Sequence, residues 1–310
     1  YNTGKIGTMR VKYPFAVGHE GSGTVVEVGS AVRNLKPGDN VAVEPAMSCG
    51  ECDQCLEGRP NTCRELIFLG CPGQAEGCLS EYVVMPEACC IPLPENMTLE
   101  QAAISEPLAI GVYAVQQALV LHESLGGASS AECESMAVIG SGPVGLSVMR
   151  AAKAAGVKRI YMTDKVKERV EVARSAGIEW AGNPNEEDVV AVLRKKEPLG
   201  VQVVVECCGQ QDGIDQSIEL ARRGGKVMIV GIPEEDRISF IAEEFRRKEL
   251  TMYYVRRQRF CVEKAIDMIS NGEVDVSFMI THRMGLEDSK QAFDALIDYS
   301  DGIVKAMVEI

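Results

Sequence analysis

The chain has 310 residues, of which 46% are hydrophobic, and it carries a formal net charge of -13 at neutral pH with a pI near 4.9. That length exceeds a comfortable single core and predicts two domains of the usual size of about 100 to 200 residues. The net negative charge argues against binding to nucleic acid or to a membrane surface. A small molecule is therefore the expected partner. We also expect a soluble protein, since no apolar run approaches the ~20 residues that span a bilayer.

Residues 1 to 108 carry short β-rich runs separated by glycine and proline, which predicts a barrel-like or sandwich domain. A Val-rich run extends from Gly23 to Gly29, a turn occupies residues 36 to 39, and the strand pattern resumes from Asn40 to Val43.

The stretch Gly18-His19-Glu20-Gly21-Ser22-Gly23, followed by Gly29, places an imidazole and a carboxylate side by side among glycines. Both side chains are zinc ligands, and glycine lets backbone crowd a metal. Taken alone, the pair is better explained as a glycine-rich turn with a polar His and an exposed Glu. Its interpretation as a metal site therefore depends on the rest of the chain.

The twelve cysteines fall into two groups. Eight are scattered in apolar surroundings, where Cys behaves as a small hydrophobe, and this usage indicates a reducing, cytoplasmic compartment. The other four, Cys49, Cys52, Cys55 and Cys63, follow the spacing C-x2-C-x2-C-x7-C. Four thiolates so close in sequence can surround one zinc ion tetrahedrally and build a structural site with no open position. The alternatives are an iron–sulfur cluster, which the intervening Glu51, Asp53 and Glu57 disfavour, and an accidental spacing.

From about Gly111 to Val255, apolar strands alternate with amphipathic helices, which predicts β-α-β units and a parallel sheet. The strands are expected at Met136 to Ile139, Arg159 to Thr163, Val201 to Val205, Lys226 to Val230 and Leu250 to Tyr254, with helices near 143 to 155, 165 to 176, 186 to 196 and 213 to 223. A helix near 261 to 270 and an apolar ending, Ile303 to Ile310, follow.

A nucleotide-binding loop is expected between the first of these strands and its helix. The loop consists of Gly140, Ser141, Gly142, Pro143, Val144 and Gly145. The first glycine allows the tight turn, the second lets backbone approach a pyrophosphate, and the third permits close packing of helix on strand. The rival Gly21-Ser22-Gly23 has neither an apolar strand before it nor a helix after it.

About 20 residues beyond this loop, Asp164 ends the next strand. A carboxylate here can accept hydrogen bonds from both ribose hydroxyls and repels a 2′-phosphate, which selects NAD over NADP. The alternative role for Asp164 is to cap the helix that follows. Lys165 and Arg169 lie nearby, and either can meet a phosphate.

Together these motifs resemble the zinc-containing medium-chain dehydrogenases, in the polyol branch typified by sorbitol dehydrogenase and its xylitol and arabinitol relatives. The resemblance covers essentially the whole chain and also includes Ser105-Glu106-Pro107-Leu108 and Thr281-His282-Arg283. It implies an α/β protein with a GroES-like β domain over residues 1–108, including a zinc lobe at 49–63. It further implies a Rossmann NAD-binding domain over 109–256 and a return to the first domain over 257–310.

The resemblance also implies the site. A catalytic zinc ion would be held by a Cys, His19, Glu20 and a water, with Glu106 beside it and Arg257 orienting polyol hydroxyls, although Arg257 also fits a solvated basic run. In such a site zinc acts as a Lewis acid on the substrate hydroxyl while a hydride passes to NAD. Relatives are commonly dimers or tetramers. For His282 we expect only a hydrogen-bonded structural role.

The chain departs from this pattern in several places. The family's Cys-Gly-x-Asp segment precedes Gly-His-Glu, and this chain begins after that point, so we expect an incomplete catalytic zinc site. Pocket positions of sorbitol-type enzymes correspond to Leu69, Pro72 and Gln258, which argues against sorbitol itself. Residues 121 to 134 are expected to form a surface insertion. The alternatives are a threonine- or glucose-type dehydrogenase and a non-catalytic NAD-binding scaffold that retains only the structural zinc.

Overall fold

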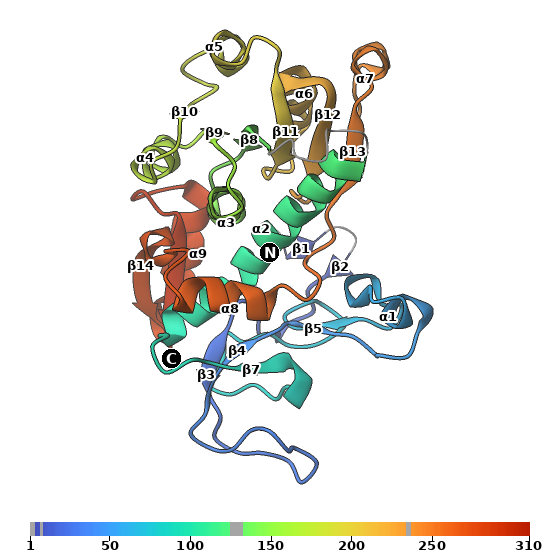
Figure 1. Ribbon diagram of the computed structural model, residues 1–310. Coiled ribbons are helices and arrows are strands. Elements are labelled where there is room, and N and C mark those ends of the chain that lie inside the picture. Colours follow the sequence, from blue (N-terminus) through green and yellow to red (C-terminus); the bar gives the residue numbers. More distant parts are fainter. Residues whose placement is uncertain (1–3, 7–8, 125–132, 234–236) are drawn as a thin grey trace. The chain divides into compact units, whose positions relative to one another are not determined.

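The computed structural model describes residues 4–6, 9–124, 133–233 and 237–310 (Figure 1). It divides into two compact units. The first comprises residues 1–109, 258–300 and 306–310, and the second comprises 110–257 and 301–305. The first unit is therefore built from sequence segments on both sides of the second.

The second unit is built on a sheet of six parallel strands in the order β10-β9-β8-β11-β12-β13. The strands are β8 (Ser135–Ile139), β9 (Arg159–Thr163), β10 (Trp180–Gly182), β11 (Val201–Glu206), β12 (Ala221–Ile229) and β13 (Thr251–Tyr254). The strand order reverses direction between β8 and β11. In a doubly wound sheet, nucleotides bind at this reversal, beyond the carboxyl ends of the strands.

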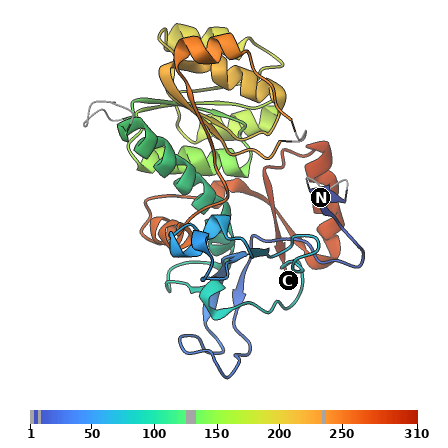
Figure 2. The ribbon, with the colours of Figure 1, turned by 90° about the vertical axis from the view of Figure 1, so that its right-hand side faces the viewer.

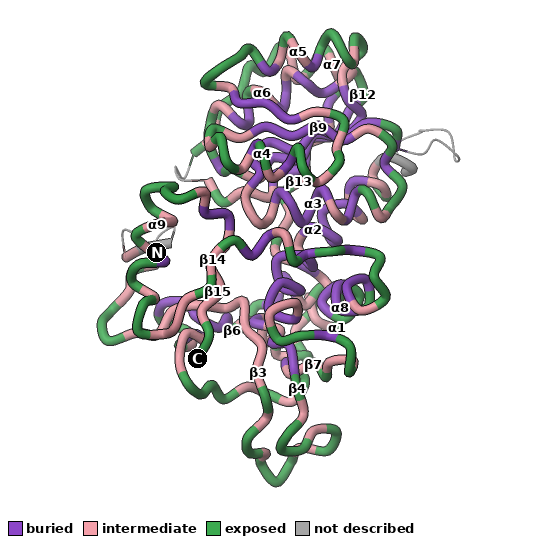
Figure 3. Tube along the Cα trace, turned by 90° about the vertical axis from the view of Figure 1, so that its left-hand side faces the viewer, coloured by how far each residue is buried: buried purple, intermediate pink, exposed green. Residues whose placement is uncertain are grey.

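Helices cover both faces of the six-stranded sheet (Figures 1 and 2). One face carries α3 (Pro143–Ala154) and α4 (Lys167–Ser175), and the other carries α5 (Val189–Lys196), α6 (Gln211–Leu220) and α7 (Ala242–Lys248). Every residue of β8 and β11 is buried, and β9 and β12 beside them are mostly buried as well (Figure 3). This burial on both faces explains why β8 and β11 are continuous apolar runs, and it confirms the predicted α/β class with its parallel sheet.

The sequence patterns placed one boundary wrongly and missed two short elements of this unit. The helix expected over 213 to 223 ends at Leu220, and β12 already begins at Ala221, with a register shift against β11. Strand β10 has three residues and α7 has seven, too few to display a clear period.

The first unit contains small sheets rather than one large sheet, and β1-β2, β3-β4-β7 and β5-β6 are antiparallel. They pair β3-β4-β7, β5-β6, β1-β2 and β14-β15. The strands are β1 (Lys5–Ile6), β2 (Met9–Arg10), β3 (Ser22–Thr24), β4 (Asn40–Val43), β5 (Ala46–Met47), β6 (Ile67–Phe68), β7 (Cys90–Pro92), β14 (Ile280–Gly285) and β15 (Lys305–Glu309), with helices α1 (Asp53–Leu56), α8 (Val262–Ser270) and α9 (Ser289–Asp298). The expected strand at Asn40–Val43 is confirmed, whereas the Val-rich run contributes only the three residues of β3.

The longest helix, α2 (Leu99–Ser124), was not predicted. Its segment Leu99–Leu121 is long and apolar enough to cross a membrane by length and composition, which corrects the expectation that no run approaches that length. Within this segment, 67% of the apolar window is buried in the structure, as in the core helix of a globular protein. Of the expected insertion over 121 to 134, residues 125–132 lie outside the described residues, and residues 121–124 belong to α2.

Gly111 of α2 lies against the backbone of α3. A Cβ atom at Gly111 would be 2.5 Å from the carbonyl carbon of Ser147. Gly-to-Ala substitution within a helix ordinarily stabilises it by up to ~1 kcal/mol, whereas overpacking against backbone costs about 1–3 kcal/mol. We expect Gly111→Ala to lower the free energy of unfolding measured in urea.

The matched control is Gly213→Ala in α6, where the atoms nearest to the added Cβ all belong to side chains: the Cys208 sulfur at 2.5 Å, Glu206 Oε1 at 3.3 Å and Ile139 Cγ2 at 3.4 Å. A side-chain sulfur can rotate away, so this variant should lose less stability. Equal stability of Gly111→Ala and the wild type would contradict the close helix contact.

Candidate functional site

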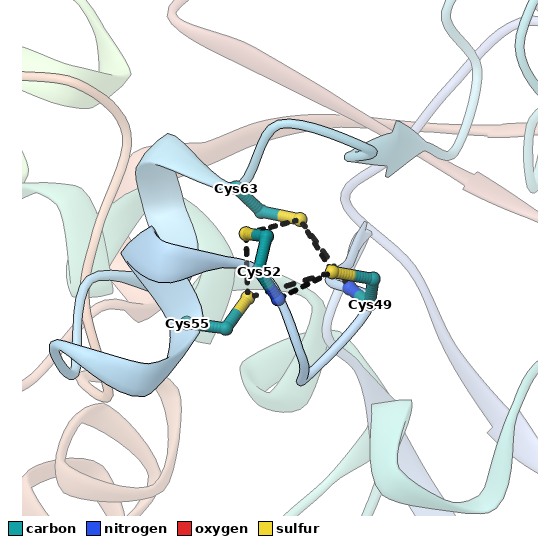
Figure 4. A group of neighbouring side chains, drawn as sticks. All are labelled: Cys49, Cys52, Cys55 and Cys63. Atoms are coloured by element: carbon teal, nitrogen blue, oxygen red, sulfur yellow. Dashed lines mark hydrogen bonds between the residues drawn. The ribbon is translucent and has the colours of Figure 1, made fainter.

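The four clustered cysteines converge in the lobe formed by α1 and its flanking loops (Figure 4). Their sulfurs lie 3.5 Å apart for Cys63 and Cys49, 3.7 Å for Cys52 and Cys55, 3.9 Å for Cys52 and Cys63, and 4.0 Å for Cys49 and Cys55. A tetrahedron with zinc–sulfur distances of 2.3 Å has edges of about 3.8 Å. The sulfurs therefore fit one mononuclear tetrahedral ion, since an iron–sulfur cluster distributes its four cysteines over two or four irons and so cannot hold all of them at these distances.

The lobe shifts the pKa values of two of these thiols in opposite directions. Backbone amides of Arg64 and Cys55 lower the pKa of the Cys52 thiol to about 6, whereas burial raises the pKa of Cys55 to about 12. Metal binding must displace the proton of Cys55, so affinity rises with pH. Outside the sulfur shell, Arg64 donates two hydrogen bonds to Asp53, at 2.6 and 2.8 Å, which closes the lobe from α1 to the segment after Cys63. No disulfide joins any of the twelve cysteines, all of which are described.

A second cluster of potential metal ligands consists of His19, Glu20 and Glu106. One ligand atom from each lies within 4.8 Å of the others. His19 and Glu20 come from the loop before β3, whereas Glu106 projects from α2, 86 residues further along the chain, and is 4% exposed. The ring of Phe68 lies 5.1 Å from that of His19, centroid to centroid, and restricts the imidazole. An imidazole and two carboxylates offer the nitrogen and oxygen ligands that zinc accepts.

The loop that carries His19 is fixed by a second backbone segment. The amides of Gly77, Cys78 and Leu79 donate to the carbonyls of residues 16, 18 and 17, at 2.7, 3.0 and 2.9 Å. A Cβ atom at Gly77 would lie 2.2 Å from the Val17 oxygen, and one at Gly70 would lie 2.4 Å from the Gly18 oxygen.

The sequence did not reveal these two contacts, because nothing distinguishes Gly70 and Gly77 among 30 glycines. Within the Gly-His-Glu motif, Gly18 has a φ of +95° and so requires glycine. By contrast, Gly23 and Gly29 have open space where a Cβ would be.

Two other expected residues of the first unit, Gln258 and His282, make hydrogen bonds within the protein. Gln258 donates to the Glu44 carboxylate, and its own amide oxygen accepts from the backbone amide of Cys261 at 2.8 Å. His282 Nδ1 lies 3.0 Å from the hydroxyl of Thr281, in agreement with the expected hydrogen-bonded structural role. Arg257 has a φ of +54° and belongs to the second unit, and its contact with substrate stays a prediction.

The nucleotide loop in the second unit has the expected geometry. Gly140, with a φ of +100°, turns the chain after β8, and its amide donates to the Thr163 carbonyl at 2.8 Å. A Cβ at Gly145 would lie 1.9 Å from the Gly140 oxygen, so only glycine fits there. Gly142 and Pro143 begin α3, and a Cβ at Gly142 would lie 3.6 Å from Nη1 of Arg169. A free helix N-terminus and a guanidinium thus face the same loop, as anion binding requires.

Asp164 is held firmly by backbone amides. Its Oδ2 accepts from Ser141 N at 2.7 Å and its Oδ1 accepts from Val166 N at 2.8 Å. The capping alternative is wrong in its simple form, because α4 begins at Lys167 and its N-cap, Val166, makes no side-chain cap bond. Each carboxylate oxygen can accept a further hydrogen bond, so Asp164 can still bind ribose hydroxyls.

A buried carboxylate that the sequence patterns did not single out lies on the other side of β8. Glu206 ends β11 and is 0% exposed, and its Oε1 accepts from the amides of Cys208 and Gly209 at 2.6 and 2.7 Å. It fixes the turn beside the nucleotide loop. Burial, and then the charge of Glu206, raise the pKa of Cys208 to about 12, so this thiol stays protonated at neutral pH and is a poor nucleophile.

Comparison with known protein families gives two matches. Residues 1–95 match the alcohol dehydrogenase GroES-like domain, and residues 143–271 match the zinc-binding dehydrogenase family. Sorbitol dehydrogenase from Bacillus subtilis is 32% identical over 309 residues, which covers 99% of this chain and 84% of that protein.

Two solved structures are similar and hold different nucleotides. A zinc-binding dehydrogenase from Sinorhizobium meliloti 1021, bound to NADP, is 29% identical with a TM-score of 0.85, covering 97% of this chain and 85% of the other. An alcohol dehydrogenase from Escherichia coli, complexed with NADH, is 26% identical with a TM-score of 0.85, covering 96% and 85%. The shared fold therefore accommodates both nucleotides, and side chains must decide between them.

The sulfur geometry predicts the result of removing one cysteine. Cys63→Ser should lower the zinc content by about one ion per chain, because four thiolates are needed to close the shell. It should also expose the lobe to trypsin at Arg64, since metal binding supplies its folding energy. Mass spectrometry of the fragments measures this. Cys90→Ser, outside the cluster, is the control and should change neither quantity.

The backbone contact at Gly77 predicts a second result. Gly77→Ala should displace the loop that carries His19 and lower zinc bound at the His19 cluster while the cysteine site stays filled, as measured by metal analysis. Gly29→Ala, which adds the same methyl group in open space, should behave as the wild type. Full metal content in Gly77→Ala would show that this packing does not position the ligands.

Proposed function

The chain belongs to the zinc-containing medium-chain dehydrogenase family, and on that basis we propose that it oxidises a polyol or another secondary alcohol to the ketose or ketone with NAD. The observation that carries this proposal is the convergence of His19, Glu20 and Glu106 in a chain that also forms a nucleotide loop next to Asp164. A redox reaction on a hydroxyl needs both a site that activates the oxygen and a carrier for the hydride.

We assign His19 and Glu20 as zinc ligands. Glu106 would contact the metal, directly or through a water. When bound, zinc supplies a Lewis acid that favours loss of the substrate hydroxyl proton. The chain's own contribution is positional: Phe68 restricts the imidazole of His19, and the hydrogen bonds from residues 77–79 fix its loop. Because Glu106 is 4% exposed, its carboxylate acts where little water competes, which strengthens its attraction to a cation.

The nucleotide would bind along the loop from Gly140 to Gly145. The amides at the start of α3 and the Arg169 guanidinium would contact the pyrophosphate. The Asp164 carboxylate would accept hydrogen bonds from the ribose hydroxyls. We place Arg257 at the substrate, where its guanidinium can donate to more than one hydroxyl of a polyol. Consistent with relatives of this kind, we propose a cytoplasmic homo-oligomer, a dimer or a tetramer.

The test measures NADH production at 340 nm with a panel of sorbitol, xylitol, 2,3-butanediol, threonine and glucose. We expect turnover of at least one polyol or diol and loss of activity on chelation. His19→Ala should lower kcat/KM by more than the ~100-fold that loss of a ligand's supporting partner costs. His282→Ala, at the other described histidine of the first unit, should be close to wild type.

Each other outcome of this test would support a different function for the chain. Turnover of threonine or glucose alone would place the chain in another branch of the family. Binding of NAD without turnover of any substrate would support the scaffold alternative. Activity that survives metal removal would rule out the zinc mechanism.

A further inference from the structure

We propose that Asp212 is a specificity-determining residue for the nucleotide. It holds the ammonium group of Lys165 away from the 2′ position of the adenosine ribose, so that no cation is available there to accept the 2′-phosphate of NADP. This inference rests on the proposed use of NAD and goes beyond it, because it assigns the rejection of NADP to a pair of carboxylates, Asp164 and Asp212.

The pair of Lys165 and Asp212 bridges two strands of the sheet. Lys165 follows β9, and Asp212 lies in the first turn of α6, which follows β11. These two strands flank β8, whose carboxyl end carries the nucleotide loop. Lys165 Nζ lies 2.6 Å from Asp212 Oδ2 and 3.3 Å from the amide oxygen of Gln210. The lysine therefore leans toward α6 and is held by two acceptors there.

Lys165 is the cation whose position decides whether the 2′-phosphate of NADP can be bound. It is the next residue after Asp164, whose carboxylate is fixed by two backbone amides at the place where the ribose is expected. A lysine ammonium on its flexible four-carbon stem can reach acceptors on either side of its own Cα. Arg169, the other cation that we assign to the nucleotide, is near Gly142 at the pyrophosphate end of the loop.

Asp212 has two effects on a 2′-phosphate. It pairs with the Lys165 charge, and its own negative charge remains near the crevice. The side chains of both residues are about half exposed, 46% for Lys165 and 48% for Asp212. Such an exposed pair contributes little free energy to folding, so its removal should leave the protein folded. The same small free energy means that a phosphate dianion can compete for Lys165 once Asp212 is neutralised.

The experiment measures the Kd of NADP and of NAD by isothermal titration calorimetry at low ionic strength. Asp212→Asn should tighten NADP binding by about five-fold, the equivalent of an exposed charge pair worth about 1 kcal/mol. The Kd of NAD, which has no 2′-phosphate, should change by less than about two-fold. In the double variant Lys165→Met with Asp212→Asn, the gain for NADP should disappear.

Asp215→Asn is the matched control. It removes the same charge from the same helix, but the hydrogen bond that Asp215 accepts comes from Gln211 and not from Lys165. It should leave both dissociation constants unchanged. Thermal unfolding of each variant checks that the fold is kept.

Three results would overturn the proposal. They are no gain for NADP in Asp212→Asn, an equal gain in Asp215→Asn, and a gain that persists without Lys165. The last two would indicate a general effect of net charge. Because these are binding measurements, they stay separate from the proposed reaction: a wild-type protein that binds NAD but turns over no alcohol would contradict the reaction and still allow this test.

Discussion

Both candidate sites depend on backbone approaching backbone at distances that exclude a side chain. At the nucleotide loop, a Cβ on Gly145 would lie 1.9 Å from the Gly140 oxygen. In the other unit, a Cβ on Gly77 would lie 2.2 Å from the Val17 oxygen. In each case the close approach fixes a short loop that has little secondary structure of its own. The functional groups are then carried by loops whose backbone these contacts hold in place.

The charged groups at these sites are held by different means. Asp164 and Glu206 accept backbone amide hydrogen bonds at the ends of β9 and β11, the two strands that flank β8, so their positions are fixed whether or not a nucleotide is present. Lys165 is held by side chains instead, through a partly exposed ion pair with Asp212 and a hydrogen bond to Gln210. We therefore assign ribose binding to the fixed carboxylate of Asp164. We assign discrimination between NAD and NADP to Lys165, whose position the charge of Asp212 controls.

The cysteine lobe depends on the arrangement of its four sulfurs and on an ion pair more than on apolar packing. None of the four residues of α1 is buried, so this helix has little apolar contact to hold it. Four sulfurs at 3.5–4.0 Å and the ion pair of Arg64 with Asp53 supply the constraint instead. A metal ion at the lobe therefore replaces the hydrophobic core that such a short segment lacks.

The sequence by itself determined the elements whose signals are local. The apolar strands, the nucleotide loop and the four-cysteine spacing all depend on residues within about 20 positions of one another, and the structure has them where the patterns place them. No local pattern brought Glu106 to His19 and Glu20, which only the family resemblance implied and the tertiary structure shows. Only the tertiary structure placed Gly70 and Gly77 against the loop that carries His19 and joined Lys165 to Asp212. These contacts link positions 47 to 87 residues apart, and a side-chain pattern read along one chain carries no record of which distant segments will meet.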